Sequence, residues 1–339
     1  MALLEIKDLQ LEFGRGANAL RAVDGVSLSL DAGETLCLVG ESGSGKSVTA
    51  LSIARLLPSP PARYVGGEIL LEGRDVLKMA SAELRDIRGG LVSYVFQDPG
   101  ASLNPVFRVG NQIKESLGLH MPGVATDAEV IRLLKLVGIP APETRIKSYP
   151  HELSGGTQQR IMIAMALASQ PKLLVADEPT TALDVTIQAQ IIDLLRDLKR
   201  RLGMAILLIT HNLGIVGDLA DRVAVLYAGQ IVETGPARDL LRWPLHPYTQ
   251  ALIASVPRLG APSGRLVGIP GNVPQPGSFP GGCRFHPRCP KAQPDCSVDP
   301  PALREVASGR SARCPYWDSK PQNPPSPKPA HEPARSRQP

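Results

Sequence analysis

The sequence predicts an α/β fold, in which helices cover both faces of a largely parallel sheet. Short apolar runs alternate along the first 235 residues with segments that have the 3.6-residue period of helices. Strands that are apolar on both faces are typical of parallel sheets with helices on each side. The predicted strands are 36–40, 69–73, 92–97, 173–177, 205–210 and 223–227.

Two helices show the periodicity most clearly. Val130, Leu133, Leu134 and Val137 recur at i, i+3, i+4 and i+7, and Gly138 is a suitable end for that helix. Apolar residues between 187 and 198 repeat in the same way behind Asp184, a good N-cap. We also expect helices over 161–169 and from the end of the glycine-rich loop at 40–47 to about Leu57.

Length and composition exclude several classes of protein. The chain has 339 residues, of which 43% are hydrophobic and 20% charged, so it is not disordered as a whole. Its longest apolar runs are much shorter than the roughly 18 residues needed to span a bilayer. The N-terminal segment lacks the features of a signal peptide and is predicted to be the first strand of a cytosolic protein.

The net charge of +5 depends mainly on the C-terminal end. Residues 319–339 contain four basic side chains and one acidic one, and the remaining residues are nearly balanced. Neither a basic stripe nor interleaved aromatic residues are present in the sequence, so a nucleic-acid partner is not expected.

Proline divides the chain. Nineteen of the 33 prolines lie from Pro257 onward, which predicts a boundary between regular structure and an irregular C-terminal region near 235–260. We therefore expect a domain over 1–235 with a helical subdomain at about 98–160, a proline-rich extension over 236–318 and a disordered tail over 319–339.

A phosphate-binding loop follows the strand at 35–39. The pattern GxxxxGK[ST], set between a strand and a helix, brings backbone N–H groups and a helix N-terminus onto phosphate oxygens. Lysine then neutralises phosphate charge and the final hydroxyl can bind magnesium. The residues are Gly40, Glu41, Ser42, Gly43, Ser44, Gly45, Lys46 and Ser47.

Two carboxylates end another apolar strand. Asp177 and Glu178 close the run LLVADE, and ligands of open α/β sheets bind at the carboxyl ends of the strands. One acid can hold magnesium while the other acts as a base on water. Without the phosphate loop, such a pair would more often be part of a surface turn.

A second helix start can bind an anion. Ser154, Gly155 and Gly156 precede the apolar helix at 161–169. Because one chain can hardly wrap its own phosphate with both helix starts, the pair suggests a dimer with shared nucleotides. A simple helix cap is the alternative.

Taken together, these motifs resemble the nucleotide-binding subunit of an ATP-binding cassette (ABC) transporter. The resemblance covers roughly residues 3–235 and rests on the phosphate loop, Gln97, LSGG at 153–156, LLVADE at 173–178, ALD at 182–184 and His211. It implies a P-loop NTPase with a mixed sheet core and a helical subdomain.

The resemblance also implies roles for individual residues. Glu178 would be the general base, His211 would contact the γ-phosphate and Asp184 would lie at the dimer interface. Ser154, Gly155 and Gly156 would reach the ATP bound by the partner subunit. Magnesium would be held by Ser47, Gln97 and Asp177. ATP would be bound by Phe13, by residues 40–47, by Thr49 and by Asp177. For Phe13, plain core packing is an equal alternative.

Two positions depart from the family pattern. Thr157 stands where a glutamine commonly ends the LSGGQ signature, and Asn212 follows the histidine where aspartate is frequent. Neither change removes a group assigned to the chemistry. Both leave open whether the two ATP sites of a dimer would be equally active.

Segments 96–105 and 246–252 and the C-terminal extension resemble ATPase subunits of the dipeptide/oligopeptide/nickel permease family, the dipeptide type above all. This implies an ATPase that energises peptide uptake at the cytoplasmic face of the membrane. Its implied partners are a second ATPase subunit, two transmembrane permeases and an extracytoplasmic binding protein. Nickel or another small solute is the alternative cargo, and a soluble ABC ATPase of DNA repair or translation is a remote alternative.

Four of the five cysteines lie in the extension. Cys37 lies in a predicted strand and is expected to be buried. Cys283, Cys289, Cys296 and Cys314 lie in a segment with few apolar residues, and in a reducing cytosol such a group suggests metal. The permease resemblance implies a [4Fe-4S] cluster, with zinc or unligated thiols as the alternatives.

Overall fold

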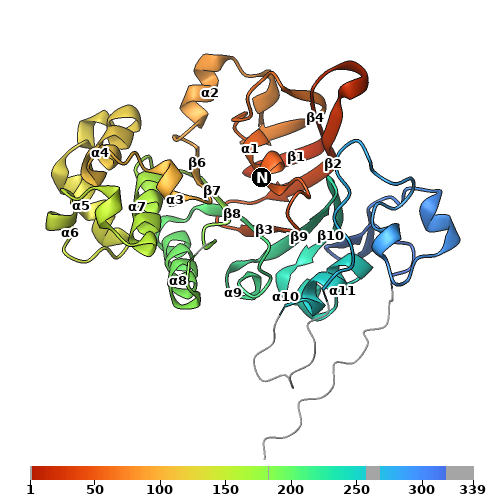
Figure 1. Ribbon diagram of the computed structural model, residues 1–339. Coiled ribbons are helices and arrows are strands. Elements are labelled where there is room, and N and C mark those ends of the chain that lie inside the picture. Colours follow the sequence, from red (N-terminus) through yellow and green to blue (C-terminus); the bar gives the residue numbers. More distant parts are fainter. Residues whose placement is uncertain (1, 182, 257–267, 318–339) are drawn as a thin grey trace, which may run out of the picture.

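The computed structural model describes residues 2–181, 183–256 and 268–317 and contains two sheets, shown in Figure 1. A four-stranded antiparallel sheet has the order β2-β1-β4-β5, and an eight-stranded sheet has the order β11-β12-β10-β9-β3-β8-β7-β6. The strands are β1 Leu4–Phe13, β2 Leu20–Leu30, β3 Thr35–Val39, β4 Ala62–Leu71, β5 Arg74–Asp75, β6 Val92–Val95, β7 Leu173–Asp177, β8 Ala205–Thr210, β9 Arg222–Tyr227, β10 Gln230–Pro236, β11 Arg304–Ala307 and β12 Arg310–Ala312.

The predicted α/β class with a mixed sheet is confirmed, but the strand predicted at 69–73 is misplaced. It is the end of β4, which pairs with β1 in the antiparallel sheet rather than with the parallel strands. Exposed residues alternate with half-buried ones along most of β4, as in a strand with one solvent-exposed face. The short apolar run at its end hid that alternation.

The parallel part of the large sheet positions the site. β6, β7, β8, β3 and β9 are neighbours in that order and all parallel, so their carboxyl ends meet at one edge. β3, β7 and β8 are almost completely buried, since side chains of both faces are covered. This edge holds the loops that follow β3, β6, β7 and β8.

Helices cover the large sheet and build a separate helical region at one end of the molecule (Figure 1). α4 and α5 pack against α7 in that region. The helices are α1 Lys46–Ser52, α2 Ser81–Ile87, α3 Pro99–Ser102, α4 Val109–His120, α5 Asp127–Leu136, α6 Pro142–Arg145, α7 Gly155–Leu167, α8 Val185–Leu202, α9 Val216–Leu219, α10 Ala237–Arg242 and α11 Pro247–Ala254.

The helix predicted to reach Leu57 is shorter, because α1 ends at Ser52. The N–H of Ile53 bonds to the carbonyl of Ala50, a tighter spacing than in an α-helix, and Arg55 has a left-handed φ of 49°. The chain therefore leaves the helix six positions before Pro58, the first of the prolines that suggested its end.

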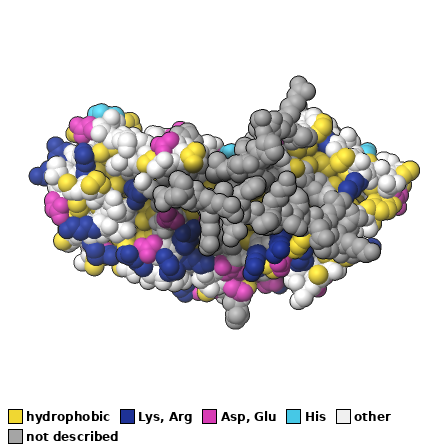
Figure 2. Space-filling view, turned by 90° about the horizontal axis from the view of Figure 1, so that it is seen from below, with side chains coloured by type: hydrophobic (Ala, Val, Ile, Leu, Met, Phe, Trp, Pro, Cys, Tyr) yellow, Lys and Arg dark blue, Asp and Glu magenta, His cyan; other side chains and the backbone are white. Residues whose placement is uncertain are grey.

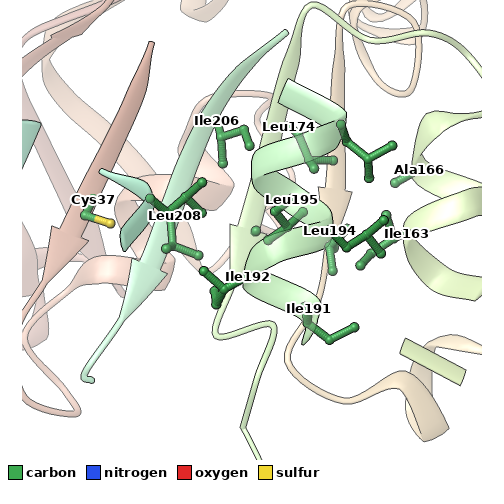
Figure 3. Close-up of a cluster of buried hydrophobic side chains, with 14 of the residues drawn as sticks. Cys37, Ile163, Ala166, Leu174, Ile191, Ile192, Leu194, Leu195, Ile206 and Leu208 are labelled. Atoms are coloured by element: carbon green, nitrogen blue, oxygen red, sulfur yellow. The ribbon is translucent and has the colours of Figure 1, made fainter. Parts of the chain in front are cut away.

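Figure 3 shows how α7 and α8 pack against the large sheet. Ile163 of α7 and Leu195 of α8 are fully buried in the same cluster as Leu174 of β7 and Leu208 of β8. Cys37 of β3 is also completely buried, as predicted, and burial raises the pKa of its thiol well above the ordinary value. This rigid layer fixes the strand ends that carry the site.

The C-terminal extension continues the large sheet. β12 pairs with β10 and β11 pairs with β12, so both strands extend the sheet beyond the strands of residues 1–236. Phe285 is buried against Tyr227 of β9 and Tyr248 of α11, with ring centroids 5.3 Å apart in both cases. The extension thus shares a core with the first 235 residues.

The molecular surface carries charges of both signs. Lys and Arg side chains alternate with Asp and Glu on the visible part of the face in Figure 2. In the part of the chain that the structure describes, no helix is long and apolar enough to cross a membrane. The predicted tail at 319–339 lies outside the described residues.

Candidate nucleotide site

A cleft of about 1180 Å³ opens at the carboxyl edge of the parallel strands. It brings together the phosphate loop after β3, Gln97 after β6, Glu178 after β7 and His211 after β8. These groups lie far apart in the sequence, and the register of the parallel strands brings them to the same edge of the sheet. The cleft residues of the loop and α1 are Glu41, Ser42, Gly43, Gly45, Lys46, Ser47 and Val48.

Two backbone carbonyls of the phosphate loop hold the side chain of Lys46. Lys46 Nζ donates to the carbonyl oxygens of Gly40 and Glu41, at 2.8 and 2.9 Å. Burial lowers the pKa of Lys46, while Glu178, Asp177 and Glu41 act in the opposite direction. A buried ammonium that donates to carbonyl oxygens can also donate to a stronger acceptor, and phosphate is one.

Asp177 and Ser47 present oxygen atoms that suit magnesium. Burial and the charge of Glu178 raise the pKa of Asp177, although a hydrogen bond with Ser47 and the charge of Lys46 oppose the shift. Asp177 Oδ1 is buried and has no hydrogen-bond partner among the residues that the structure describes. A buried carboxylate oxygen without a partner beside a hydroxyl fits a hard cation, so the residues present are compatible with magnesium.

Glu178 is held by three neighbours. Its Oε1 lies 3.1 Å from His211 Nδ1, and its Oε2 accepts from Gln97 Nε2 at 3.2 Å and from Thr181 Oγ1 at 2.9 Å. Burial alone would raise the pKa of Glu178, but hydrogen bonds from His211 and Thr181 and the charge of Lys46 outweigh it, so the pKa is lowered. This carboxylate is ionised at neutral pH and aimed into the cleft.

Several residues predicted to bind ATP lie behind the residues that line the cleft. Thr49 is fully buried and its hydroxyl donates to the carbonyl of Gly45 at 2.9 Å. Gly40, Ser44 and Asp177 also lie outside the cleft lining. The prediction that Thr49 binds ATP is therefore not supported by its position, because its side chain faces the loop backbone.

The second helix start lies away from this cleft. Ser154 caps α7, since its Oγ accepts from the N–H of Thr157 at 3.4 Å. Gly155 and Gly156 form the first turn of α7 and are not part of the cleft lining. Asp184 caps α8 by accepting from the N–H of Ile187 at 3.0 Å and is exposed.

Phe13 lines the cleft from the end of β1, where it is opposite Leu20 of β2. An aromatic face in that place can stack on a nucleobase. Core packing is the equal alternative that the sequence allows for this ring. The half-buried ring is open to the cleft.

Sequence reasoning missed a group of cleft residues from the extension. Segment 272–276, with the sequence NVPQP, lines the cleft beside Phe13 and Leu20. Arg288 forms a two-point ion pair with Glu41 of the phosphate loop, at 2.8 and 2.9 Å. No local pattern marked these residues, because their roles depend on contacts with residues more than 200 positions away.

Comparisons with known proteins agree with this geometry. The family model described as "ABC transporter" matches residues 23–181, and the model described as "Oligopeptide/dipeptide transporter, C-terminal region" matches residues 232–296. The oligopeptide transport ATP-binding protein AppD of Bacillus subtilis is 48% identical over 314 residues, which cover 92% of this chain and 96% of the relative. This chain belongs to the ABC transporter ATP-binding proteins.

Further relatives support the assignment. The dipeptide transport ATP-binding protein DppD of Escherichia coli K12 is 47% identical over 318 residues, which cover 93% of this chain and 97% of the relative. A solved structure of the ATP-binding cassette MJ0796, described as a dimeric post-hydrolysis state bound to ADP and Pi, has a TM-score of 0.62. It is 27% identical and covers 69% of this chain and 99% of its own. The activity of this ABC protein is the hydrolysis of ATP.

The four extension cysteines of this ABC protein line one cavity of about 400 Å³. All four are free thiols, and burial raises the pKa of Cys314 to about 11. Among the described residues, no group of three or more His, Cys, Asp or Glu side chains is arranged to hold a metal ion. The predicted zinc or [4Fe-4S] site therefore has the donor set in one place but no preformed ligand geometry. The cysteines are Cys283, Cys289, Cys296 and Cys314.

Proposed function

We propose that this chain is the ATP-hydrolysing subunit of an importer for dipeptides and oligopeptides. The observation that carries the proposal is the combination, on one chain, of the assembled nucleotide cleft with a region matching the oligopeptide/dipeptide transporter C-terminal model. The names of the relatives AppD and DppD agree with this cargo. The energy-coupling site lies here, and the cargo site lies on other subunits.

Glu178 is the general base in this proposal. Its ionised carboxylate accepts a proton from the water that attacks the γ-phosphate, and His211 and Gln97 hold that carboxylate in place. Lys46 and the N–H groups of residues 42–47 bind the phosphates. Ser47, Asp177 and Gln97 would hold Mg²⁺, which neutralises phosphate charge when bound.

The second half of each ATP site comes from another subunit. Ser154, Gly155 and Gly156 form a capped helix start outside this chain's own cleft, so they are free to reach the nucleotide of a partner. Asp184 lies at the exposed start of α8, beside Val185, whose side chain is 82% exposed. A head-to-tail dimer with a second, different ATPase subunit covers these positions.

The segment after Gln97 contacts the membrane partners. Phe96, Val106 and Phe107 are large apolar residues that are 42%, 70% and 52% exposed. Val106 and Phe107 lie between Gln97 and α4, and Phe96 directly precedes Gln97. Exposed apolar side chains near one another in a segment are typical of an interaction surface. This chain lies at the cytoplasmic face of the inner membrane and contacts two transmembrane permeases. An extracytoplasmic binding protein completes the system.

The cysteine cavity holds a [4Fe-4S] cluster in this proposal, because four thiols from separate turns surround one space in a reducing compartment. Zinc is the alternative. The test is to purify the protein anaerobically and measure iron, sulfide and zinc, alongside a protein with Cys283 and Cys314 replaced by serine. Four irons and four sulfides per chain support the cluster, and a protein without iron, sulfide and zinc contradicts both metal assignments.

Transport is tested by uptake of a labelled dipeptide into cells that lack this gene. The cells receive the native gene, the Glu178→Gln variant or an empty vector. Uptake restored by the native gene alone supports both the cargo and the catalytic base. If the native gene restores uptake of labelled nickel but not of the dipeptide, the peptide assignment is wrong.

A further inference from the structure

The C-terminal extension forms part of the wall of the nucleotide cleft. Asn272, Val273, Pro274, Gln275 and Pro276 line the cleft together with the phosphate loop and Phe13. The extension therefore reaches a site that the first 235 residues alone leave open. Figure 1 shows the blue extension lying beside β2 and β10.

Packing places this segment at the base-binding side of the cleft. A Cβ added to Gly277 would lie 2.7 Å from a terminal methyl of Leu20, so the chain after Pro276 runs directly against β2. Leu20 is opposite Phe13 in the antiparallel sheet. Glu178 and His211 reach the cleft from the other sheet, at the ends of β7 and β8.

The chemistry of the segment suits a sugar or base better than a phosphate. Asn272 and Gln275 are exposed carboxamides, each with donors and an acceptor, whereas the segment contains no cation. Ribose hydroxyls and nucleobase edges also present both donors and acceptors. Pro274 and Pro276 lack N–H groups that could bind phosphate, and their rings restrict the backbone.

Arg288 holds this wall in register with the phosphate loop. Its guanidinium donates to both carboxylate oxygens of Glu41 and also to the carbonyl oxygens of Pro270 at 2.7 Å and Gly271 at 3.2 Å. Its side chain is only 6% exposed. A buried guanidinium joined to both segments fixes the distance between them, because its planar donors have fixed directions.

We propose that the extension completes the nucleotide site. Asn272 and Gln275 contact the ribose and base of ATP, and Arg288 is the positioning residue that holds their segment against the phosphate loop. The inference rests on the proposed nucleotide-site residues and is independent of the cargo.

The test compares two ligands that share the triphosphate. Equilibrium binding of ATP and of inorganic tripolyphosphate is measured on the full chain with Asn272 and Gln275 both changed to Ala. We expect the ATP Kd to rise about 5- to 10-fold, as for the loss of one or two hydrogen bonds, with the tripolyphosphate Kd unchanged. An unchanged ATP Kd, or an equal rise for both ligands, overturns the proposal.

Arg288 is tested separately because it touches both segments. Arg288→Gln should weaken the binding of ATP more than that of tripolyphosphate, because only ATP also loses the contacts of Asn272 and Gln275. Arg288→Lys should restore part of the loss because it keeps a charge beside Glu41. Ser308→Ala, at an exposed position of the same extension outside the cleft, is the matched control. Wild-type Kd values for both ligands in Arg288→Gln would contradict the positioning role. Because binding does not require hydrolysis, these binding results can be interpreted even if Glu178 is not the general base.

Discussion

Glu178 and His211 lie in contact at the ends of two neighbouring parallel strands, with Oε1 and Nδ1 3.1 Å apart. The register of β7 and β8, which sets Asp177 opposite Ile209, brings the two residues together. The positive φ of Glu178, 48°, turns its side chain toward the cleft rather than along the strand. The contact keeps an ionised carboxylate where water can be activated.

Glu178→Gln should lower the rate of ATP hydrolysis by about 100-fold or more, because the amide cannot accept a proton and a positioned base contributes at least that much. ATP binding should be retained, since Lys46 and the loop N–H groups are intact. Steady-state hydrolysis by the assembled transporter, together with equilibrium binding, measures both effects.

Glu143→Gln is the control for that experiment. Glu143 forms an exposed ion pair with Lys135, far from the cleft lining. Its replacement should leave turnover within about twofold of the native value, because such surface pairs contribute little. Near-native hydrolysis by Glu178→Gln would mean that another group is the base.

Two glycines of the phosphate loop should respond differently to alanine. A Cβ on Gly40 would lie 2.2 Å from the backbone oxygen of Leu226, whereas a Cβ on Gly43 meets nothing within 4 Å. Gly40→Ala must displace the loop and should abolish ATP binding. Gly43→Ala has only the cost of its positive φ, about 1 kcal/mol, and should keep binding within about tenfold.

Fluorescence titration with labelled ATP compares the two alanine variants, and circular dichroism checks that both are folded. Equal affinities for Gly40→Ala and Gly43→Ala would show that the loop can move away from Leu226 without loss of the site.

His246 should make the protein sensitive to mild acid. Burial lowers its pKa to about 3, and its Nδ1 accepts from the N–H of Tyr248 at 3.0 Å. The unfolded chain binds the proton near pH 6.5, so this contribution to stability is complete above that pH and is lost as the pH falls toward 3. The loss amounts to about 1.4 kcal/mol per pH unit within that window.

His246→Asn keeps a side-chain acceptor at the helix start and removes the titrating group. The free energy of unfolding, measured between pH 7.5 and 5, should therefore fall less steeply for this variant than for the native protein. A constant offset is expected from the smaller side chain. Parallel pH profiles for the two proteins would contradict a role for His246.

Phe285→Ala should loosen the extension, because Phe285 is 1% exposed and packs on two buried tyrosines. Removal of a buried phenylalanine costs about 3–5 kcal/mol. Hydrogen exchange should accelerate over residues 268–317 much more than in β3 or β8. Val298→Ala, at a position that is 70% exposed in the same extension, should leave the exchange rates unchanged. Uniform acceleration across both sheets would mean that the extension is not a separate unit of stability.

The sequence alone determined the local parts of this site. The phosphate loop, the carboxylates at the end of β7 and the capped starts of α7 and α8 depend on a few neighbouring residues, since glycines, N-caps and apolar runs act within one turn or one strand. Periodicity also predicted α5 and α8, and the predicted strand around Cys37 indicated that its side chain is buried. The antiparallel pairing of β4 and the early end of α1 were not predicted, because the neighbouring residues in the sequence do not specify a strand's partner or a left-handed turn.

The tertiary structure decided what the extension does. Proline content predicted an irregular region, yet β12 joins β10, Phe285 enters the core and Arg288 pairs with Glu41 across 247 positions of the sequence. Such contacts depend on which surfaces meet after folding, and composition does not encode that choice. Loop closure over so many residues costs entropy, which the shared core and the buried ion pair help to offset. The wall of the nucleotide cleft exists only because these distant segments pack together.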